Sequence, residues 1–576
     1  MQEVLGFRGA ASAAYTAVGD TDPQVPGTAD ASPVTPGCRR RPRWWLLWGA
    51  LAVCGVFLTL AAGDAGASGA AETDAPKPTC AGSLQAKIDN AVPGATVDLA
   101  GGCIYRESVV IDKPLTLQGS GAGEIRGSDV WEDWNKSGPS WVSQEPVPEL
   151  FYPPEYRCEA SSQRCRWPEQ VFVDGNPLAQ VASTPKAGQF TLDADRRVVL
   201  PDDPEGHTVE VTVREEWVVG KSRDVTVEGI TMKHAAHNGL WNAGFPGWTV
   251  ERTDLSHAHG INLVLSIGGS LLARDNHLHH AGQLGMASNE ADVEIVGNRI
   301  HTNNTEGFDP GWAAGGMKIA QPRTAVISDN EIYDNEEIGI WTDIVNADQT
   351  SVEIARNRIY NNPRQGIRVE ITKNFSVHDN LLWENGWGTG DAYSGAGIAV
   401  AGSRDGTVND NVLAWNASGI AVVQQDRRGA DEQAYDVTRD VRLNRNKIVQ
   451  DEIPGSSEHA AILWNANRYA IAGGAPSLED PAVNNGGAND AFWFDEPEGE
   501  TYRFKWDDKY DTLAEYNSTP AERGGRYLSD AEKVALLREN AMPAAPKDHP
   551  QAQAGEGSWL IAGLSRLVDW LGQVLA

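Results

Sequence analysis

Between residues 224 and 450 the chain consists of short runs in which apolar and polar residues alternate. A glycine followed by an apolar residue marks the same point in successive runs and recurs at intervals of 21 to 31 residues. These glycines are Gly239, Gly260, Gly285, Gly316, Gly339, Gly366, Gly397 and Gly419. A repeat of roughly 20–50 residues is typical of a solenoid, and period-two alternation predicts strands. The pattern therefore indicates stacked β coils.

A pattern of asparagines keeps step with these glycines. Six asparagines have Leu or Ile two positions later: Asn276, Asn298, Asn330, Asn357, Asn380 and Asn411. Five of the six have another asparagine five positions later: Asn303, Asn335, Asn362, Asn385 and Asn416. Stacked asparagine side chains hydrogen-bond along the axis of stacked β structures, so we expect them in the corners of a parallel β solenoid. The leucine-rich repeat is the competing solenoid, but its LxxLxL signature is missing.

The opening of the folded region has the residues of a helical cap and a first coil. They are Leu84, Gln85, Ile88 and Asp89, then Pro93, Gly94, Thr96 and Val97, then residues 113–117. Together with the repeat, this opening resembles exported bacterial right-handed parallel β-helix proteins of the pectate-lyase-like type. The resemblance covers about residues 80–128 and 221–470. It implies an all-β, right-handed parallel β-helix. Such proteins include polysaccharide lyases, hydrolases and epimerases, and also copper-handling and non-catalytic surface proteins.

The segments between these regions complete the expected organisation. Composition and pattern predict a disordered tail (1–43), an apolar segment (44–63), a linker (64–78), a β-helix cap (79–128), a β-rich insertion (129–220), the β-helix (221–470), a C-terminal extension (471–556) with a helix at 529–540, and an amphipathic helix (557–576). The last helix is predicted to pack on the open end of the β-helix or to dock a partner, and the alternative is that it lies on the membrane.

The apolar segment 44–63 carries no charge and is long enough to span a membrane. Arginines precede it, which predicts a single-pass protein of the cell membrane with its C-terminal part outside. The small residues Ala65, Gly66 and Ala67 favour the alternative, a cleaved signal peptide and a secreted protein. Both interpretations export the rest of the chain.

Cysteine usage agrees with export. Four cysteines follow the apolar segment, namely Cys80, Cys103, Cys158 and Cys165. An even number after an export signal suggests disulfides, and four cysteines allow three pairings. Pairing of nearest neighbours gives Cys80–Cys103 and Cys158–Cys165.

The charge balance narrows the choice of partners. The chain has 48 basic and 79 acidic residues, and its formal net charge is −31. This charge excludes general affinity for nucleic acid and electrostatic docking on anionic lipid. It would also repel an anionic glycan, which favours a neutral substrate or a bridging metal ion.

Alignment of the coils on the repeated glycine predicts which side chains face outward. Positions two and four residues after each glycine should point away from the core. In three successive coils these positions hold Lys318, Trp341, Asp343, Arg368 and Glu370. Neighbouring coils lie about 4.8 Å apart, so Asp343 and Glu370 should stand side by side as an acid–base pair, or ligate Ca²⁺ together. Asn289 occupies the same column two coils earlier.

Two long loops precede strands of this face and should form the walls of a groove. One carries Asp309 and Trp312, and the other carries Trp387 and Tyr393. The stretch Gly307, Phe308, Asp309, Pro310 resembles the start of the Asp-Pro-His motif of mannuronan C5-epimerases, but Gly311 replaces the histidine. The characteristic motifs of polygalacturonases are absent as well.

A column of rings is expected on another face. It reads His257, His279, His301, Tyr333, Tyr360 and Trp383. We expect an outward stack of rings that packs coil on coil, and the alternative is a copper or zinc site of His257, His279 and His301.

Together these features favour a carbohydrate-active enzyme. In a lyase, Lys318 takes the ring proton while Arg368 or Ca²⁺ neutralises a uronate, and in a hydrolase Asp343 and Glu370 share the acid and base roles. Trp341, Asp309, Trp312, Asn289, Trp387 and Tyr393 would bind the sugar. Non-catalytic glycan binding and metal handling are the alternatives. The two carboxylates are expected to be exposed, so that their removal costs little stability.

Overall fold

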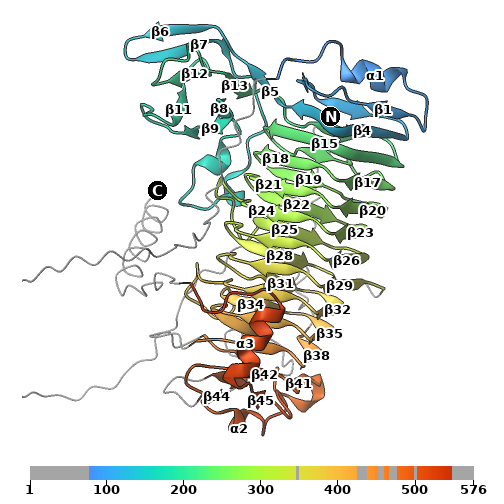
Figure 1. Cartoon of the computed structure of the whole chain (residues 1–576), viewed down its shortest axis with the longest axis vertical. Coiled ribbons are helices and arrows are strands. Elements are labelled where there is room, and N and C mark those ends of the chain that lie inside the picture. The colour runs from blue at the N-terminus through green and yellow to red at the C-terminus, as the bar shows by residue number, and fades with distance from the viewer. Residues whose placement is uncertain are drawn as a thin grey trace, which may run out of the picture. The chain divides into compact units, whose positions relative to one another are not determined.

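A computed structural model describes residues 77–345, 349–424, 437–451, 459–465, 477–497, 503–506 and 508–547. They fold as a right-handed parallel β-helix with a helical cap, a β-rich insertion and C-terminal helices, as predicted (Figure 1). The predicted tail (1–43) and residues 64–76 of the predicted linker lie outside the described residues.

Each coil of the β-helix contributes one strand to one sheet and two strands to another. The first sheet has 13 strands in the described residues. It contains β3 (Val109–Ile111), β14 (Val218–Gly220), β16 (Leu240–Trp241), β19 (Ile261–Val264), β22 (Leu284–Asn289), β25 (Gly315–Ala320), β28 (Ile338–Asp343), β31 (Ile367–Glu370), β34 (Ala396–Ala401), β37 (Ser418–Val423), β40 (Ile462–Asn465), β43 (Phe504–Trp506) and β44 (Asp508–Tyr510).

The second sheet has 23 strands in the described residues and covers the other two faces. One face holds β1 (Thr96–Asp98), β17 (Trp248–Glu251), β20 (Gly268–Arg274), β23 (Ala291–Val296), β26 (Thr324–Ser328), β29 (Ser351–Ala355), β32 (Lys373–His378), β35 (Arg404–Asn409), β38 (Arg439–Asn444) and β41 (Gly486–Ala488). The other holds β2 (Ile104–Tyr105), β18 (Asp254–Ala258), β21 (His277–His279), β24 (Arg299–His301), β27 (Glu331–Tyr333), β30 (Arg358–Tyr360), β33 (Leu381–Trp383), β36 (Val412–Ala414), β39 (Lys447–Val449), β42 (Ala491–Trp493) and β45 (Arg526–Tyr527). The long strands β4 (Leu115–Arg126) and β15 (Val225–Ala235) span both faces.

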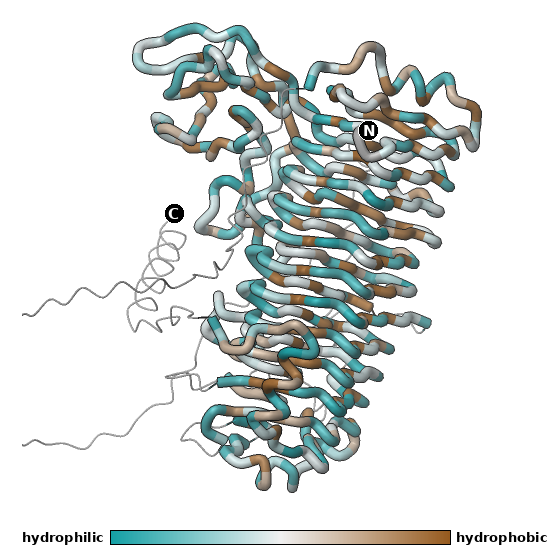
Figure 2. Tube along the Cα trace, viewed as in Figure 1, coloured by the Kyte–Doolittle hydropathy of each residue, from teal (hydrophilic) through white to brown (hydrophobic). Residues whose placement is uncertain are grey.

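The interior of the coils is the hydrophobic core. Residues after the repeated glycines, such as Met317, Ile340 and Ile367, are 0–1% exposed and belong to one continuous cluster. In Figure 2 hydrophobic positions recur at the same place in successive coils. At the glycine itself there is no room for a side chain, because a Cβ on Gly339 would lie 2.5 Å from the carbonyl oxygen of Gly366. The repeated glycine therefore marks close stacking of the backbone, and the apolar residue after it points into the core.

Two ladders of asparagine close the corners of the coils. In one, Asn276, Asn298, Asn330, Asn357, Asn380, Asn411 and Asn446 each accept hydrogen bonds from the coil before. In the other the same role falls to Asn303, Asn335, Asn362, Asn385 and Asn416. The residue before most ladder positions has a left-handed backbone, for example φ of 58° at Asp329 and 56° at Arg356.

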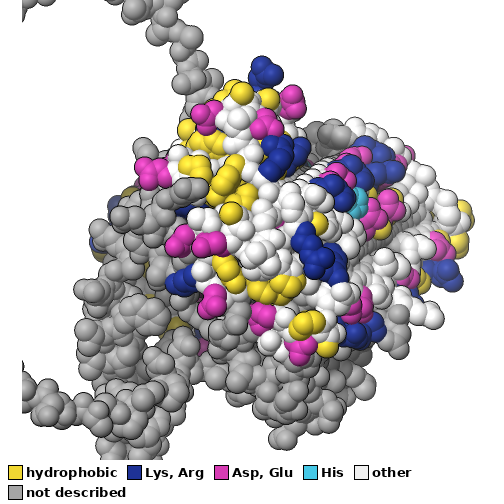
Figure 3. Space-filling view, turned by 90° about the horizontal axis from the view of Figure 1, so that it is seen from below, with side chains coloured by type: hydrophobic (Ala, Val, Ile, Leu, Met, Phe, Trp, Pro, Cys, Tyr) yellow, Lys and Arg dark blue, Asp and Glu magenta, His cyan; other side chains and the backbone are white. Residues whose placement is uncertain are grey.

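Ion pairs between coils line the outside of the first corner. Arg356 pairs with Asp329 at 2.9 Å, and Arg445 pairs with Asp410 at 2.6 Å. On the face seen in Figure 3, basic and acidic side chains accordingly lie close together. The excess of acidic groups in the sequence does not form one broad acidic surface on this face.

The N-terminal cap is the short helix α1 (Leu84–Asn90). Ser83 caps it by accepting a hydrogen bond from the Ala86 amide, and Glu107 accepts one from the Leu84 amide at 2.7 Å. Leu84 and Ile88, one helical turn apart, are buried on the first coils. The predicted disulfide Cys80–Cys103 is present and joins the chain before the helix to the first coil.

The insertion forms two small sheets. One contains β6 (Trp134–Ser137), β7 (Ser140–Pro146), β10 (Ala179–Gln180), β11 (Gln189–Leu192) and β12 (Arg197–Leu200), and the other contains β5 (Ser128–Val130), β8 (Val171–Val173), β9 (Asn176–Pro177) and β13 (Val209–Thr212). Between β7 and β8 run two 3₁₀ turns, η1 (Glu155–Arg157) and η2 (Arg164–Arg166), joined by the second predicted disulfide, Cys158–Cys165.

The C-terminal extension covers the last coils. It contains η3 (Pro481–Val483), α2 (Leu513–Tyr516) and α3 (Asp530–Glu539). The capping box predicted at Ser529 and Glu532 opens α3, which buries Leu536 and Leu537 against Trp383 and Trp415. The ladder of Asn446 ends in this region on Asp490, whose carboxylate accepts from the Asn446 amide at 2.6 Å.

The structure corrects the prediction of a single-pass membrane protein. Within the described residues, no helix is both long and apolar enough to cross a membrane. The segment 44–63, on which the prediction rested, and the amphipathic segment 557–576 both lie outside the described residues.

Candidate functional site

Three adjacent strands of the 13-stranded sheet bring the predicted outward residues together. Lys318 on β25 stands in register with Trp341 on β28, which stands in register with Arg368 on β31. The same register carries Asp343 and Glu370 to the ends of their strands. The cluster formed by these five residues is called the Lys318 cluster below.

Two ion pairs surround one indole ring in the Lys318 cluster. The Lys318 ammonium lies 2.9 Å from a carboxylate oxygen of Asp343, and the Arg368 guanidinium lies 2.7 Å from Glu370. Both cations also face Trp341, at 3.4 Å from its ring centroid for the ammonium nitrogen and 4.2 Å for the guanidinium carbon. The two positive charges are thus held apart by an aromatic face and are each balanced by a carboxylate.

The cluster is buried, contrary to the prediction that its carboxylates are exposed. Asp343 is 1% exposed and Glu370 is 0% exposed, and Trp341 is buried as well. The reason is that the loops before β25 and β34 lie over the strand face. The Trp312 carbonyl accepts a hydrogen bond of 2.7 Å from Lys318, and the Tyr393 ring lies 5.7 Å from the Arg368 guanidinium. Lys318 keeps the largest contact with solvent, with 17% of its side chain exposed.

Burial brings the pKa values of Lys318 and Asp343 closer together. It lowers the pKa of Lys318, although the Asp343 charge opposes this shift. It raises the pKa of Asp343, where Lys318 acts in the lowering direction and Glu370 in the raising one. For Arg368 burial acts to lower the pKa, but Glu370 outweighs it, so this guanidinium stays charged. Proton transfer between Lys318 and Asp343 therefore costs less than it would in water.

Several polar atoms of the cluster have no hydrogen-bond partner among the described residues. They are Asp343 Oδ1, Trp341 Nε1 and Arg368 Nε. An unsatisfied buried polar atom costs about 1–3 kcal/mol, so a purely structural ion network would normally satisfy them. They are available to a bound molecule.

Calcium does not fit between Asp343 and Glu370. Each carboxylate already has a cationic partner, and Ca²⁺ needs six to eight oxygen ligands. An ion there would lie against Lys318 and Arg368, which repel it. No chemical step is assigned to Ca²⁺ at this site.

A second pair, which was not predicted from the sequence, lies at the opposite end of the same strands. Glu337 lies 2.6 Å from Arg364. Burial raises the pKa of Glu337 to about 7, against the lowering effect of Arg364 and with help from the charges of Glu159 and Asp309. These two residues stand two positions before the repeated glycines Gly339 and Gly366. A third column, read two positions before each glycine, would have found them.

The remaining predicted contacts divide into two groups. Asp309 belongs near Glu337, as its charge effect shows, and its carboxylate also accepts from the Gly311 amide. Trp312 packs edge-on against Tyr156 of the insertion and supplies the carbonyl to Lys318. Trp387, in contrast, donates its indole hydrogen bond to the Trp415 carbonyl on another face, and Asn289 interacts with the adjacent Glu290.

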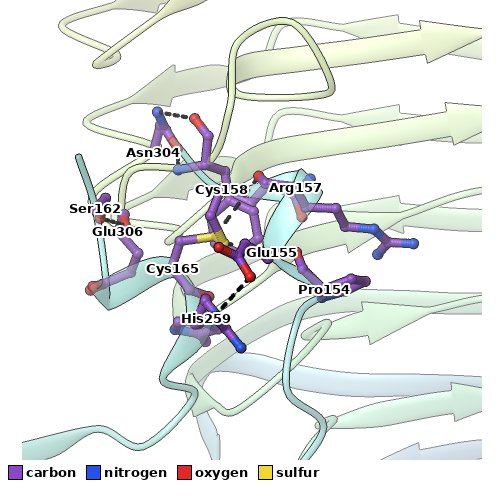
Figure 4. The surroundings of a disulfide bond; sticks show 12 residues. Pro154, Glu155, Arg157, Cys158, Ser162, Cys165, His259, Asn304 and Glu306 are labelled. Carbon is purple, nitrogen blue, oxygen red and sulfur yellow. Dashed lines mark hydrogen bonds and ion pairs between the residues drawn. A yellow bond between two sulfur atoms is a disulfide. The ribbon is translucent and has the colours of Figure 1, made fainter. Parts of the chain in front are cut away.

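The second disulfide fixes the loop that covers Lys318. Figure 4 shows Cys158 and Cys165 beside His259, Asn304 and Glu306. The Cys165 carbonyl lies 2.9 Å from a ring nitrogen of His259, and Ser162 donates to the Glu306 carbonyl at 2.8 Å. Cys158 also forms an antiparallel bridge with Phe308. The insertion thereby determines where Asp309 and Trp312 lie.

The predicted stack of rings is present on the short-strand face. His279, His301, Tyr333, Tyr360 and Trp383 stack in order, with centroid distances of 5.3, 4.8, 4.8 and 4.2 Å. His257 instead meets His279 edge-on at 6.3 Å, so the alternative metal set of His257, His279 and His301 is not assembled as proposed. A depression of about 450 Å³ lies beside the stack, lined in part by Arg252, Asp254, His277 and Arg299.

Comparisons with known proteins give one match to a family model and distant similarities to solved structures. A family model described as "Right handed beta helix region" matches residues 228–413. A structure of XylC with xylose is 15% identical, with a TM-score of 0.48, and the match covers 73% of this chain and 82% of that one. The A-module of a mannuronan C-5 epimerase of Azotobacter vinelandii is 14% identical, with a TM-score of 0.39, and the match covers 74% and 95%. An alginate lyase with a trisaccharide is 11% identical, with a TM-score of 0.37, and the match covers 71% and 81%. At these values the similarities carry no information on activity. No curated protein matches the sequence.

Proposed function

The chain is a right-handed parallel β-helix protein, and we propose that it is a polysaccharide lyase with its active site at the Lys318 cluster. The observation that carries the proposal is the Lys318 ammonium, which is held between the Trp341 ring and the Asp343 carboxylate under a loop. Burial lowers its pKa and raises that of Asp343, so a neutral amine forms more readily there than in water.

The residues divide the work of a β-elimination. Arg368 pairs with the carboxylate of a uronate residue, which makes the neighbouring ring proton more acidic. The Lys318 amine takes that proton, the electrons of the C–H bond form a carbon–carbon double bond, and the glycosidic bond to the leaving oxygen breaks. Water or a nearby acid protonates the leaving oxygen. Trp341 offers an apolar face to the sugar ring once the substrate has displaced the Trp312 carbonyl from Lys318.

Hydrolysis is the second candidate, because one observation favours it. Glu337 has a pKa raised to about 7 and so suits a general acid near neutral pH, and the charge of Asp309 acts on it. The Asp343–Glu370 pair suits hydrolysis less well than the sequence indicated, since both carboxylates are paired with cations.

The test uses the oxidised protein on a panel of uronate and neutral polysaccharides. A lyase produces an ultraviolet absorbance from the unsaturated sugar, and we expect this signal to disappear in Lys318→Met and to persist in the matched control Lys447→Met, an exposed lysine of β39. Reducing ends without the absorbance, lost in Glu337→Gln, would support hydrolysis instead. Binding without turnover of any polymer would overturn the proposal that the protein is an enzyme.

A further inference from the structure

Three histidines and one aspartate meet on the short-strand face, which belongs to the other sheet than Lys318. His277 and His279 leave β21 on the same side, His301 comes from β24, and Asp254 comes from β18. The strands are neighbours, and His279 stands in register with His301. One ring nitrogen of each histidine lies within 4.8 Å of one in each of the others.

Asp254 fixes the orientation of two of these rings. Its carboxylate oxygens lie 2.9 Å from Nδ1 of His277 and 3.3 Å from Nε2 of His279. An ionised carboxylate only accepts hydrogen bonds, so the facing nitrogen of each ring must carry the hydrogen. The opposite nitrogen of each neutral ring then has a lone pair. For His277 this is Nε2, and for His279 it is Nδ1, which lies 2.6 Å from Nδ1 of His280.

The lone pair of His277 points at another nitrogen. Nε2 of His277 lies 2.7 Å from Nε2 of His301, whose Nδ1 faces the Thr302 hydroxyl at 2.9 Å. Two imidazole nitrogens at this distance need a proton or a cation between them, because two lone pairs would repel. A carboxylate behind a histidine that offers its other nitrogen is the usual support of a metal ligand.

We propose that His277, His279 and His301 bind a divalent late transition-metal ion, of the Zn²⁺ or Cu²⁺ type, with Asp254 as the carboxylate that orients the rings. Imidazole ligands suit these ions, whereas Ca²⁺ and Mg²⁺ prefer oxygen. Metal–nitrogen bonds of about 2.0–2.1 Å at a tetrahedral angle separate the nitrogens by roughly 3.3 Å. The Nε2 atoms of His277 and His301, now 2.7 Å apart, would therefore move apart on binding, and the nitrogen of His279 lies within 4.8 Å of them.

The site is open to solvent on one side. His277 and Asp254 line the depression of about 450 Å³, and their side chains are 31% and 37% exposed. Three protein ligands leave at least one coordination position for water or a ligand. Arg252 and Arg299 line the same depression together with Asp254 and Asp275, so charges of both signs face this position.

The inference does not depend on the proposed lyase activity. The histidines share no residue with the Lys318 cluster and lie on a different sheet. The stack of rings from His301 to Trp383 explains why rings occupy this column. It does not explain His277, which stands outside the column, or Asp254.

The test measures metal binding by tag-free, chelator-treated full-length protein. We expect one Zn²⁺ or Cu²⁺ per chain by calorimetry and elemental analysis, no binding of Ca²⁺, and a visible absorption band when Co²⁺ is the probe. The double variant His277→Gln/His301→Gln should lose the ion, and Asp254→Asn should weaken binding about 10–100-fold. His207→Gln and His378→Gln, two histidines that also pair with carboxylates, are the matched controls and should bind like the wild type.

Two results would overturn the proposal. One is the absence of stoichiometric binding of Zn²⁺, Cu²⁺ and Co²⁺ by the wild-type protein, a measurement that involves no variant. The other is an unchanged Co²⁺ spectrum in a double variant whose circular dichroism in chelator equals that of the wild type.

Discussion

The asparagine ladders and the Lys318 cluster are both buried polar arrays that run from coil to coil. Only in the ladders do the side chains satisfy one another's hydrogen-bonding groups. The side chain of Asn357 takes part in four hydrogen bonds: it accepts two from Asn330 and donates one to the Ile327 carbonyl and one to the Asn380 side chain. The Lys318 cluster instead carries four charges and leaves Asp343 Oδ1, Trp341 Nε1 and Arg368 Nε without a partner among the described residues.

The difference separates a structural array from one suited to chemistry. A neutral amide repeats indefinitely, because each side chain accepts from the asparagine of the coil before and donates to the asparagine of the coil after. The charged groups buried in three coils do not form such a repeating chain of hydrogen bonds. The pKa values of Lys318 and Asp343 move toward each other instead. The ladder therefore holds the coils in register, and the cluster uses that fixed register to position its groups.

The largest expected effect is on the ladder. Asn357→Ala removes the acceptor of the Asn330 backbone amide and of the Asn330 side-chain amide, and it removes the side-chain donor to the Ile327 carbonyl. At about 1–3 kcal/mol for each unsatisfied buried group, the free energy of unfolding should fall by about 5 kcal/mol. Urea denaturation followed by circular dichroism measures this change.

The matched control is Asn409→Ala. Asn409 also bonds to an asparagine of the next coil, Asn444 at 2.9 Å, but it is partly exposed. Water can replace its partner, so the cost should stay below about 1 kcal/mol. Equal costs at the two positions would contradict the idea that burial makes the ladder structural.

The next effect concerns the cluster. Asp343→Ala leaves the Lys318 ammonium buried beside Arg368, and removal of one partner of a buried pair costs about 3–5 kcal/mol. The double variant Lys318→Met/Asp343→Leu removes both charges and should recover most of that stability while activity remains lost. If the double variant were as unstable as Asp343→Ala, the ion pair itself would stabilise the fold, and its charges would not be kept for activity alone.

The sequence predicted the columns of both arrays but not their surroundings. Asparagines at fixed offsets and charges after repeated glycines follow from one periodicity, so Lys318, Trp341 and Arg368 could be placed in one stack. The exposure of Asp343 could not be predicted, because the loop that covers it is held by Cys158 and Ser162, about 140 residues earlier in the chain. Periodicity says nothing about a contact of that kind.

The residues that were missed share a physical reason. Glu337 and Arg364 occupy positions just before the strand begins, where period-two alternation no longer fixes a direction. The corners have a similar limit, since Asp329 and Arg356 adopt left-handed backbone that the sequence would assign to glycine or asparagine. Stacking of the coils imposes that conformation on them.

A smaller effect is expected in the dependence of stability on pH. Burial raises the pKa of Glu337 to about 7, so its carboxyl keeps a proton in the folded protein that the unfolded chain releases near pH 4.3. The stabilisation is complete below that pH and is lost as the pH rises through about 7. The loss should be about 2 kcal/mol, with allowance for the partly exposed Arg364. In Glu337→Gln, urea midpoints between about pH 4 and pH 8 should vary less. An unchanged slope would assign the dependence to other groups.

The smallest effect tests the place where the ladder meets a charge. Asp490 occupies the ladder position that follows Asn446, one coil further on. Its carboxylate accepts hydrogen bonds from the backbone and side-chain amides of Asn446 at 2.6 and 3.0 Å, as an asparagine would. Burial and the neighbouring Glu522 raise its pKa well above the usual value, so the folded protein retains a proton that the unfolded chain releases above about pH 4. Stability is therefore lost as the pH rises from there toward the pKa of the folded state.

Asp490→Asn keeps the acceptor for Asn446, offers an amide to Glu522 and removes this loss of stability. We expect a gain of about 1 kcal/mol at pH 8 and none near pH 4, since Glu522 remains buried and its own pKa is also raised. Denaturation curves of the variant and the wild type at both pH values measure the difference. A loss of stability at pH 8 would mean that the charge of Asp490 is itself favourable, and that the ladder ends on an ionised group.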